Sequence, residues 1–521
     1  MNPALNLAVN LASIPAVGEP VRRKLADRLL RPTLPELWTF LAVALPALAA
    51  LIATLPTVDL AYQLRAGSEI LAGRGIPSVD TWTFTASGEP WLDQQWGAQA
   101  ILAAIYQAAG WAGLAILRAG LVAVTFGLVL VAVRRRAPGL GSRPAAWLTL
   151  AAFVVAAPAL ALRPQLLGMA CFALALVLVA GRRERPGLAL LLPVVAIAWA
   201  NVHGSFILAP VLAGLAFLED VHERSPRAGR MLLVGIATGA ATLVTPFGLG
   251  AWRYAAGLAT NREVTARITE WQPTTPTDIP GVLFWGSVVL VAIAVVRSAG
   301  VRGGVPWPAL LTLVAFAGLG AVAARGVAWW PPLAAVTISG MLLAAAGDGP
   351  AAGSWPTAFN GPGRASRGSR LHALVGAGLV LAAIGFLPTW RATDPGTGAP
   401  SGLLAFAPSG ATAALRDLAV PDDRVWNPQP WGSWFEFAVP DPAYALDSRI
   451  EVIPPGTWRD AEVLASAGPG WDGILDAAQV TIVITDPQLG AWPLTEALAT
   501  SGRWALVFSD GEGAIWVRAG R

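Results

Sequence analysis

Long apolar stretches alternate with short polar segments over the first three quarters of the chain. A helix of about 20 apolar residues crosses the hydrocarbon core of a bilayer, and a helix satisfies every backbone polar group within itself. The pattern therefore predicts an all-α polytopic membrane bundle of about 11 transmembrane helices. We place them at residues 36–57, 112–133, 145–162, 165–181, 187–201, 204–219, 230–246, 280–296, 306–323, 327–346 and 371–388.

Arginine clusters separate the connecting segments into two sets. Because Lys and Arg are retained on the cytoplasmic side of a membrane, the segments that carry them should be cytoplasmic. These are residues 1–35, 134–143, 182–185, 224–230, 297–302 and 364–370. The opposite set includes the first outer loop, 58–111, and everything after about residue 389, so we expect a multi-pass protein of the cytoplasmic membrane with its N-terminus inside.

The composition agrees with a chain built for lipid. Hydrophobic residues make up 55% and charged residues only 13% of 521 positions, and the mean hydropathy is +0.57. A soluble globular chain of this length would not show that balance. The net charge is only +4, and the basic residues cluster beside apolar stretches, so we read them as topology signals and expect no nucleic-acid partner. No Walker A, HExxH, CxxC or GxSxG motif is present.

The character changes after about residue 403, where short apolar strands, Gly/Pro turns and amphipathic helices predict a small α/β domain. VTIVITDP and WALVFSD are the clearest strand candidates. We assign residues 36–388 to the transmembrane domain and 389–521 to this extracytoplasmic domain. Trp431, Trp434, Asp447 and Arg449 either pack its core or contact a glycan or the membrane domain.

Unusual polar residues occur on the predicted outer side. Asp59 ends the first span, and a carboxylate at the membrane surface is costly unless it is paired, hydrated or used. Tyr62 to Leu71 has helical spacing, which predicts a short surface helix. Further along the same loop, acids and amides mix with tryptophans, and other outer turns add more polar groups. They are Asp80, Trp82, Trp91, Asp93, Gln95, Trp96, Arg163, Gln165, Asn201, His203, Arg253, Glu270, Trp271 and Arg325. The plain alternatives are interface anchoring by the tryptophans, surface solvation by the charges, and a turn histidine at His203.

These features resemble the GT-C superfamily of polytopic membrane glycosyltransferases, near protein-mannosyltransferase-like and lipid A sugar-transferase-like bacterial proteins. The resemblance rests on the acid after the first span, the long first outer loop with its surface helix, and the outward polar groups. WANVHGSF and IPSVDTWTFTASGEPWLDQQW look like a recurring uncharacterised bacterial subgroup. Membership implies transfer of a sugar from a polyprenyl-phosphate donor to a glycan, lipid or protein acceptor on the outer face.

The resemblance also implies roles for residues. Asp59 matches the first-loop catalytic acid, and Asp93 or Asp80 would be the second acid. Arg163, His203 and Arg325 would hold the lipid phosphate, with further substrate contacts from Gln165, Asn201, Gln95, Trp96 and Tyr62. A divalent cation, Mg²⁺ or Mn²⁺, would be bound by Asp59 and Asp93 if one is used. Leu60 stands where many members have a second acid, which keeps a catalytically silent membrane scaffold open as an alternative. A transporter or flippase of lipid-linked glycans is another alternative; it would need charged or broken-helix positions near the bilayer middle, whereas the polar groups here lie at one predicted face.

Overall fold

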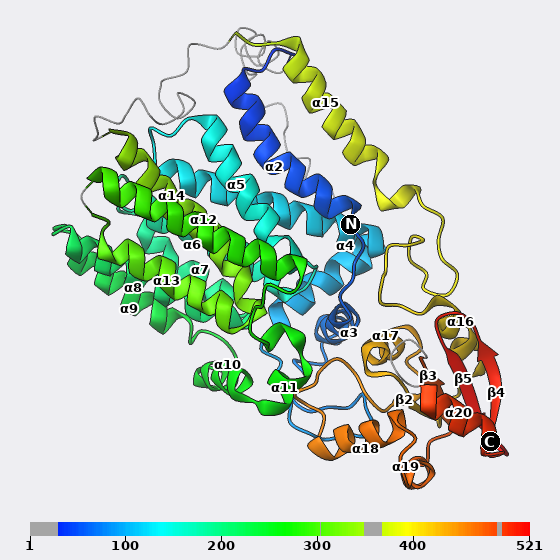
Figure 1. Cartoon of the computed structure of the whole chain (residues 1–521). Helices are drawn as coiled ribbons and strands as arrows, with labels where there is room; N and C mark the ends of the chain where they lie inside the picture. The colour runs from blue at the N-terminus through cyan, green and yellow to red at the C-terminus, as the bar shows by residue number, and fades with distance from the viewer. Residues whose placement is uncertain (1–29, 303, 348–366, 487–491) are drawn as a thin grey trace, which may run out of the picture.

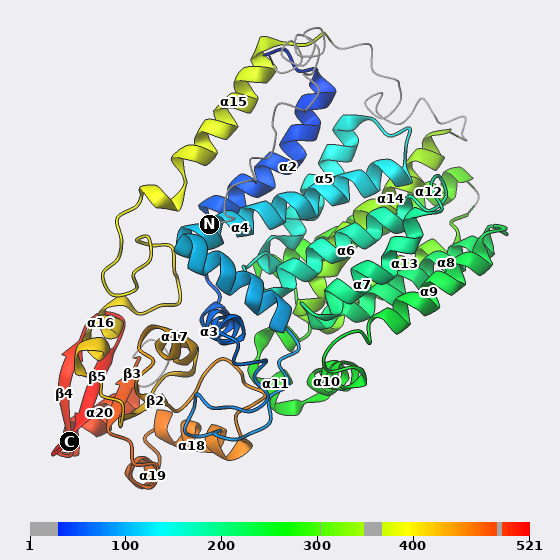
Figure 2. The ribbon, with the colours of Figure 1, turned by 180° about the vertical axis from the view of Figure 1, so that it is seen from behind.

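The computed structural model describes residues 30–302, 304–347, 367–486 and 492–521. The chain forms a bundle of mostly apolar helices and, below it in Figure 1, a small α/β domain; the short helices α3, α10 and α11 lie between the two, as the reverse view in Figure 2 also shows. Most of the predicted cytoplasmic segment 1–35 lies outside the described residues.

Each predicted span falls on one bundle helix. The helices are α2 (Leu34–Ile52), α4 (Trp96–Arg136), α5 (Ser142–Ala156), α6 (Pro164–Ala180), α7 (Leu192–Ala200), α8 (Leu208–His222), α9 (Ala228–Ala241), α12 (Ile279–Arg302), α13 (Trp307–Val322), α14 (Trp330–Gly347) and α15 (Arg370–Gly385). In the described part of the chain, five helical segments are long and apolar enough to cross a membrane, and five shorter apolar helices have 10–17 residues. The predicted count of about 11 spans is therefore not confirmed, and the orientation of the bundle stays a prediction.

α4 is the central helix, packing against α2, α3, α5, α6 and α14. It is 41 residues long and kinks at Gly110, whose φ of 59° and ψ of −157° are non-helical. Glycine adopts this conformation without the steric cost that a Cβ brings. The limb before the kink, residues 96–109, was expected to be loop. At the periphery, α12 and α15 leave large apolar side chains such as Leu290 and Leu381 more than 60% exposed, as expected of a lipid-facing surface.

α3 (Asp59–Leu71) is the surface helix that the spacing predicts. It follows α2 after a short extended link, so Asp59 starts a separate helix instead of ending the first span. The link is held by the later chain: Leu55 N donates to Leu403 O at 2.7 Å, and Ala405 N donates to Leu55 O at 3.1 Å. This fixes where α3 begins relative to the C-terminal domain.

The remaining short elements lie in the connections. They are η2 (Ala157–Ala159), η3 (Leu188–Leu191), η4 (Gly204–Ile207), α10 (Leu249–Thr260), α11 (Arg262–Arg267), η5 (Thr269–Trp271), η6 (Ala324–Trp329) and η7 (Pro388–Trp390). α10, α11 and η5 together make a long connection between α9 and α12 that runs past the C-terminal domain (Figure 1).

The C-terminal domain contains a five-stranded sheet of order β2-β1-β3-β5-β4, so the predicted α/β character is confirmed. Its elements are α16 (Ser409–Leu418), β1 (Arg424–Trp426), α17 (Gln429–Ala438), β2 (Ala443–Tyr444), α18 (Pro455–Ala465), α19 (Trp471–Ala477), β3 (Ile482–Thr485), α20 (Trp492–Thr500), β4 (Trp504–Ser509) and β5 (Ala514–Arg518). β1 runs parallel to β2 and β3, and β5 is antiparallel to β3 and β4. Trp434 and Trp431 are buried in its core, which agrees with the packing interpretation of these tryptophans.

The first outer loop joins this domain directly. Phe84 N donates to Tyr444 O at 3.0 Å, so the loop pairs with the free edge of β2. Arg65 on α3 donates from Nη1 to the backbone oxygen of Glu436 on α17 at 3.0 Å. The two segments are thus connected by backbone and side-chain hydrogen bonds, and the cavity described next lies beside this junction.

Candidate functional site

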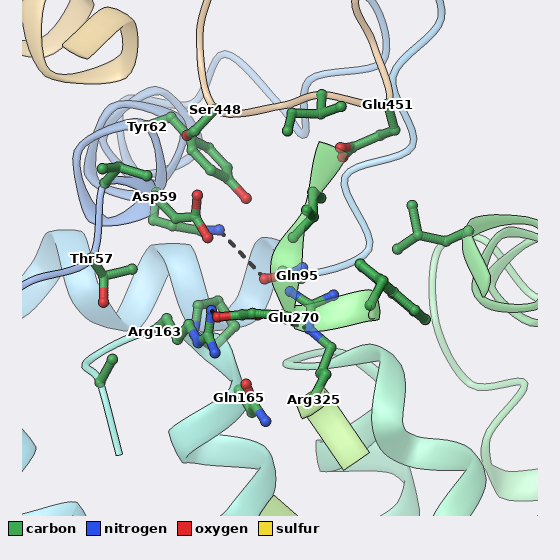
Figure 3. Close-up of a pocket in the computed structure, with 18 of the residues that line it drawn as sticks. Thr57, Asp59, Tyr62, Gln95, Arg163, Gln165, Glu270, Arg325, Ser448 and Glu451 are labelled. Carbon is green, nitrogen blue, oxygen red and sulfur yellow. Dashed lines mark hydrogen bonds and ion pairs between the residues drawn. The ribbon is translucent and has the colours of Figure 1, made fainter. Parts of the chain in front are cut away.

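A cavity of about 430 Å³ lies where α3, the start of α6, the connection around η5, η6 and the C-terminal domain meet (Figure 3). Nine residues that the sequence singled out line it: Asp59, Tyr62, Gln95, Arg163, Gln165, His203, Glu270, Trp271 and Arg325. They come from segments far apart in the chain, so the structure brings together polar groups that the sequence only placed on one predicted face.

α3 presents Asp59 and Tyr62 to the cavity from one face, because residues three apart lie on the same side of a helix. Its other face is buried against α4 through Leu60 and Leu64. Gly67 allows this close approach: a Cβ there would lie 2.0 Å from the carbonyl oxygen of Gln99. The position of Asp59 therefore depends on a tight helix contact behind it.

Two arginines share one carboxylate on the wall opposite α3. Arg163 Nη1 lies 2.7 Å from Glu270 Oε1, and Arg325 Nε lies 3.3 Å from Glu270 Oε2. Arg163 immediately precedes Pro164, the first residue of α6, whereas Arg325 lies in η6 and stacks over Trp271 at 5.1 Å from the ring centroid. The triad carries one net positive charge and faces the Asp59 carboxylate.

The surroundings of Asp59 raise the pKa of its carboxyl group. Burial is the largest influence and raises its pKa; Arg163 and Arg325 oppose this, and the negative charge of Glu270 adds to it. The Ser448 hydroxyl lies within hydrogen-bond reach and lowers the pKa slightly in turn. Glu270 behaves differently: burial pushes its pKa upward, but its two arginines outweigh burial and leave the pKa below its usual value. The cavity thus holds one ionised, paired carboxylate and one carboxylate with raised proton affinity.

His203 is neutral in this environment. Its Nδ1 accepts a hydrogen bond from the Ser205 backbone N at 3.1 Å, which caps η4. Burial, followed by the positive charges of Arg325 and Arg163, lowers its pKa to about 3. A neutral imidazole cannot supply the positive charge that we expected it to offer a phosphate, although it remains a hydrogen-bonding group of the lining. The capping contact is the turn-histidine arrangement.

The C-terminal domain contributes a wall that the sequence analysis did not identify. Gln429, Ser448 and Glu451 line the cavity, and Tyr254 on α10 donates to Glu451 Oε1 at 3.0 Å. Burial raises the pKa of Glu451. The sequence singles out Asp447 and Arg449, and their neighbours Ser448 and Glu451 are the residues that line the cavity.

Four predicted site residues lie outside this cavity lining. Asp80 is buried and accepts hydrogen bonds from the Thr83 hydroxyl at 2.6 Å and from Arg449 Nη2 at 2.5 Å. Asp93 is also buried, where it accepts from Gln99 Nε2 at 2.6 Å. The Trp96 indole donates to Asn201 Oδ1 at 3.0 Å, so these two bind each other. All four have local partners, although the second carboxylate oxygen of Asp93 is buried without one among the described residues, and we do not include Asp80 or Asp93 in the candidate reaction centre.

The donor set does not fit the predicted divalent cation. Among the described residues no group of three or more His, Cys, Asp or Glu side chains is arranged to hold a metal ion. The two arginines engage Glu270, Tyr254 engages Glu451, and Asp93 is not part of the lining, so the cavity does not bring together Asp59 and Asp93, the pair that would bind a cation if one is used.

Comparisons with known proteins identify the fold. No protein-family model matches the sequence, and no curated protein sequence matches it. Crystal structures of the Archaeoglobus fulgidus oligosaccharyltransferase are similar: the apo form has a TM-score of 0.52, and the form tethered to an acceptor peptide with an NVT sequon also has 0.52. The archaeal oligosaccharyltransferase AglB, in complex with an inhibitory peptide and a dolichol-phosphate, has 0.53. Each is 12% identical, and the match covers 92% of this chain and 74% of the other. The resemblance drawn from the sequence is thus confirmed for the architecture, and the chain has the GT-C fold.

Proposed function

We propose that this protein is a glycosyltransferase of the cytoplasmic membrane that moves a sugar from a polyprenyl-phosphate-linked donor to an acceptor on the outer face. The observation that carries the proposal is one cavity in which Asp59, a carboxylate with raised proton affinity, faces the two arginines Arg163 and Arg325. The proposed orientation has the N-terminus cytoplasmic and residues 389–521 outside.

The chemistry needs both halves of this cavity. The acceptor attacks the anomeric carbon while the bond from that carbon to the phosphate oxygen breaks, and the phosphate leaves with the electron pair. Asp59 takes the acceptor proton, and its raised pKa makes the carboxylate a stronger base than an ordinary aspartate. Arg163 and Arg325 stabilise the charge that develops on the departing phosphate. The acceptor proton ends on Asp59 and the electron pair of the broken bond ends on the phosphate, so the step needs no further reactant.

The solved neighbours support the substrate class. One Archaeoglobus fulgidus oligosaccharyltransferase structure is a complex with a dolichol-phosphate and an inhibitory peptide, and a second structure has a tethered acceptor peptide. By analogy of fold we assign a lipid-phosphate donor and leave the acceptor as a peptide, glycan or lipid. Arg163 directly precedes the first residue of α6, and Arg325 lies in η6, so both arginines of the lining lie at helix ends. This supports a transferase over the transporter or flippase alternative, because transporter sites lie near the bilayer midplane.

The test is transfer from radiolabelled polyprenyl-phosphate sugars by the purified protein in nanodiscs, with membrane extract as acceptor source. Asp59→Asn should lower the transfer rate by about 10²-fold or more, the scale of a lost general base. The matched control is Asp417→Asn, an exposed aspartate on α16. Equal transfer by Asp59→Asn and wild type would remove the proposed base, and no transfer by any variant would favour the silent scaffold.

A further inference from the structure

A second cavity of about 360 Å³ lies directly behind the arginine–glutamate triad. It shares Arg163, Gln165, Glu270 and Arg325, together with Pro158 and Thr269, with the cavity that contains Asp59, so these residues form a common wall. Its lining exposes more apolar than polar surface, and in the rest of it Ala159, Pro273, Pro280, Gly281, Ala324 and Val327 accompany the polar residues Gln272, Thr274, Thr275 and Asp278. The wall therefore separates a polar chamber from a more apolar one.

The second cavity opens at the start of α12. Pro280 is the second residue of this helix, and its neighbours Ile279 and Val282 are 77% and 54% exposed. Because α12 has an apolar exposed flank, it is where a lipid chain would lie against the protein in a bilayer. An isoprenoid tail could enter the apolar chamber from this side.

Glu270 is held on a backbone segment that is fixed at both ends. On one side Ala324 N donates to Gln272 O at 3.0 Å and Thr274 N donates to Ala321 O at 3.1 Å. On the other side Arg267 lies 2.9 Å from Glu462 of α18. The backbone around Glu270 is therefore anchored to the bundle and to the C-terminal domain, and only rotation of the Glu270 side chain is needed to open the wall.

The wall also contains a buried side-chain amide without hydrogen-bond partners. Gln165 is 2% exposed, and within the described part of the chain neither of its side-chain amide atoms has a hydrogen-bond partner. A buried amide without partners is costly, which points to a polar ligand at this position. The planar guanidinium groups of the two arginines beside it can bind two oxygens of a phosphate as well as the two oxygens of a carboxylate.

We propose that Glu270 is a displaceable counter-ion: the donor phosphate replaces its carboxylate between Arg163 and Arg325, accepts a hydrogen bond from Gln165, and thereby joins the two cavities. The isoprenoid end then lies in the apolar chamber and the sugar lies beside Asp59. In the absence of donor, Glu270 keeps the two guanidinium groups paired and the wall closed. This inference rests on the proposed function, since it takes the lipid phosphate as the ligand.

The test is binding of farnesyl phosphate, measured by isothermal titration in detergent, with farnesol as the uncharged probe. Glu270→Gln removes the carboxylate charge that competes with the phosphate for the two arginines. Farnesyl phosphate should then bind about five- to tenfold more tightly, a factor that corresponds to the free energy of a partly exposed ion pair. Gln165→Leu should weaken it about tenfold. Glu89→Gln, an exposed glutamate of the first outer loop, is the matched control and should leave binding unchanged. Farnesol should bind all four proteins alike.

The outcomes separate this inference from the proposed function. Unchanged or weaker binding by Glu270→Gln overturns the counter-ion role, and so does failure of both wild type and Glu270→Gln to bind farnesyl phosphate; in either case a positive transfer assay keeps the transferase. If Glu270→Gln does not fold, Glu270→Asp serves instead. Its shorter side chain should reach the arginines less well and tighten binding to an intermediate degree, and weaker binding by this variant counts against the proposal.

Discussion

Replacing Arg449 by Met should separate the first outer loop from the C-terminal domain. Arg449 is 1% exposed and donates from Nε to Asp447 at 2.6 Å and from Nη2 to Asp80 at 2.5 Å. Its guanidinium also lies 4.3 Å and 4.6 Å from the ring centroids of Trp82 and Trp91. Met fills similar volume, but it leaves two buried carboxylates without their cation.

The magnitude follows from that burial. Removing one partner of a buried, hydrogen-bonded ion pair costs about 3–5 kcal/mol because the remaining charge is uncompensated. Both carboxylates are as buried as the arginine, so solvent does not soften this cost. For a region of this size the loss corresponds to a fall in melting temperature of about 10 °C or more. Transfer activity should fall as well, since Ser448 and Glu451 flank this segment and line the cavity.

The assay is thermal melting of the purified variants in detergent, followed by tryptophan fluorescence. Arg503→Met is the matched control: Arg503 is 42% exposed and pairs with Asp476 at the surface, so its loss should leave the melting temperature nearly unchanged. Adding Asp80→Asn to Arg449→Met should recover part of the loss, because one unpaired charge disappears. Equal melting temperatures for the two Met variants would refute the reasoning.

Two other predictions concern the same outer region. Burial raises the pKa of Asp93 to about 7, above the value near 4 in the unfolded chain. Unfolding therefore releases a proton between these two pH values, and the free energy of unfolding falls by about 1.4 kcal/mol per pH unit as the pH rises from 4 toward 7. Asp93→Asn should remove this slope, and melting at pH 5 and pH 7 measures it; an unchanged slope in the variant contradicts the assignment. Gly67→Ala should cost about 1–3 kcal/mol and reduce transfer by shifting α3 and Asp59, because its Cβ meets the Gln99 carbonyl. Gly214→Ala, with open space around its Cβ, is the control, and equal behaviour of the two alanine variants would count against the close-contact argument.

The helices were predictable because hydrocarbon demands apolar side chains and internally satisfied backbone, and both demands are visible in local sequence. The first limb of α4 was missed for a different reason. Its buried residues, such as Gln99 and Leu102, pack against α3, and Tyr106 contacts Phe437 of the C-terminal domain. Contacts between segments that are distant in the sequence stabilise this limb, and the hydropathy of neighbouring residues does not reveal such contacts.

The sequence could predict those site residues whose place at the end of an apolar helix already indicates that their side chains leave the bundle. Arg163 and Arg325 lie in short turns at helix ends, and both reach the cavity. Asp80 has the same residue type as Asp59 and lies in the same loop, but Arg449, more than 350 positions later, occupies it. Which of two carboxylates faces a cavity and which faces an arginine depends on the tertiary fold, so the sequence could not separate them.

The same long-range packing makes the C-terminal domain part of the proposed reaction centre. Burial is the largest cause of the raised pKa of Asp59, and Ser448 and Glu451 supply part of the cavity wall beside it. If that wall were absent, more water would solvate the Asp59 carboxylate, and its pKa would fall toward the ordinary value. A weaker base would then face the acceptor in the proposed reaction. We therefore expect the salt bridge between Arg449 and Asp80 to influence the proposed transfer indirectly, because it fixes the segment that carries Ser448 and Glu451, although Arg449 itself does not line the cavity.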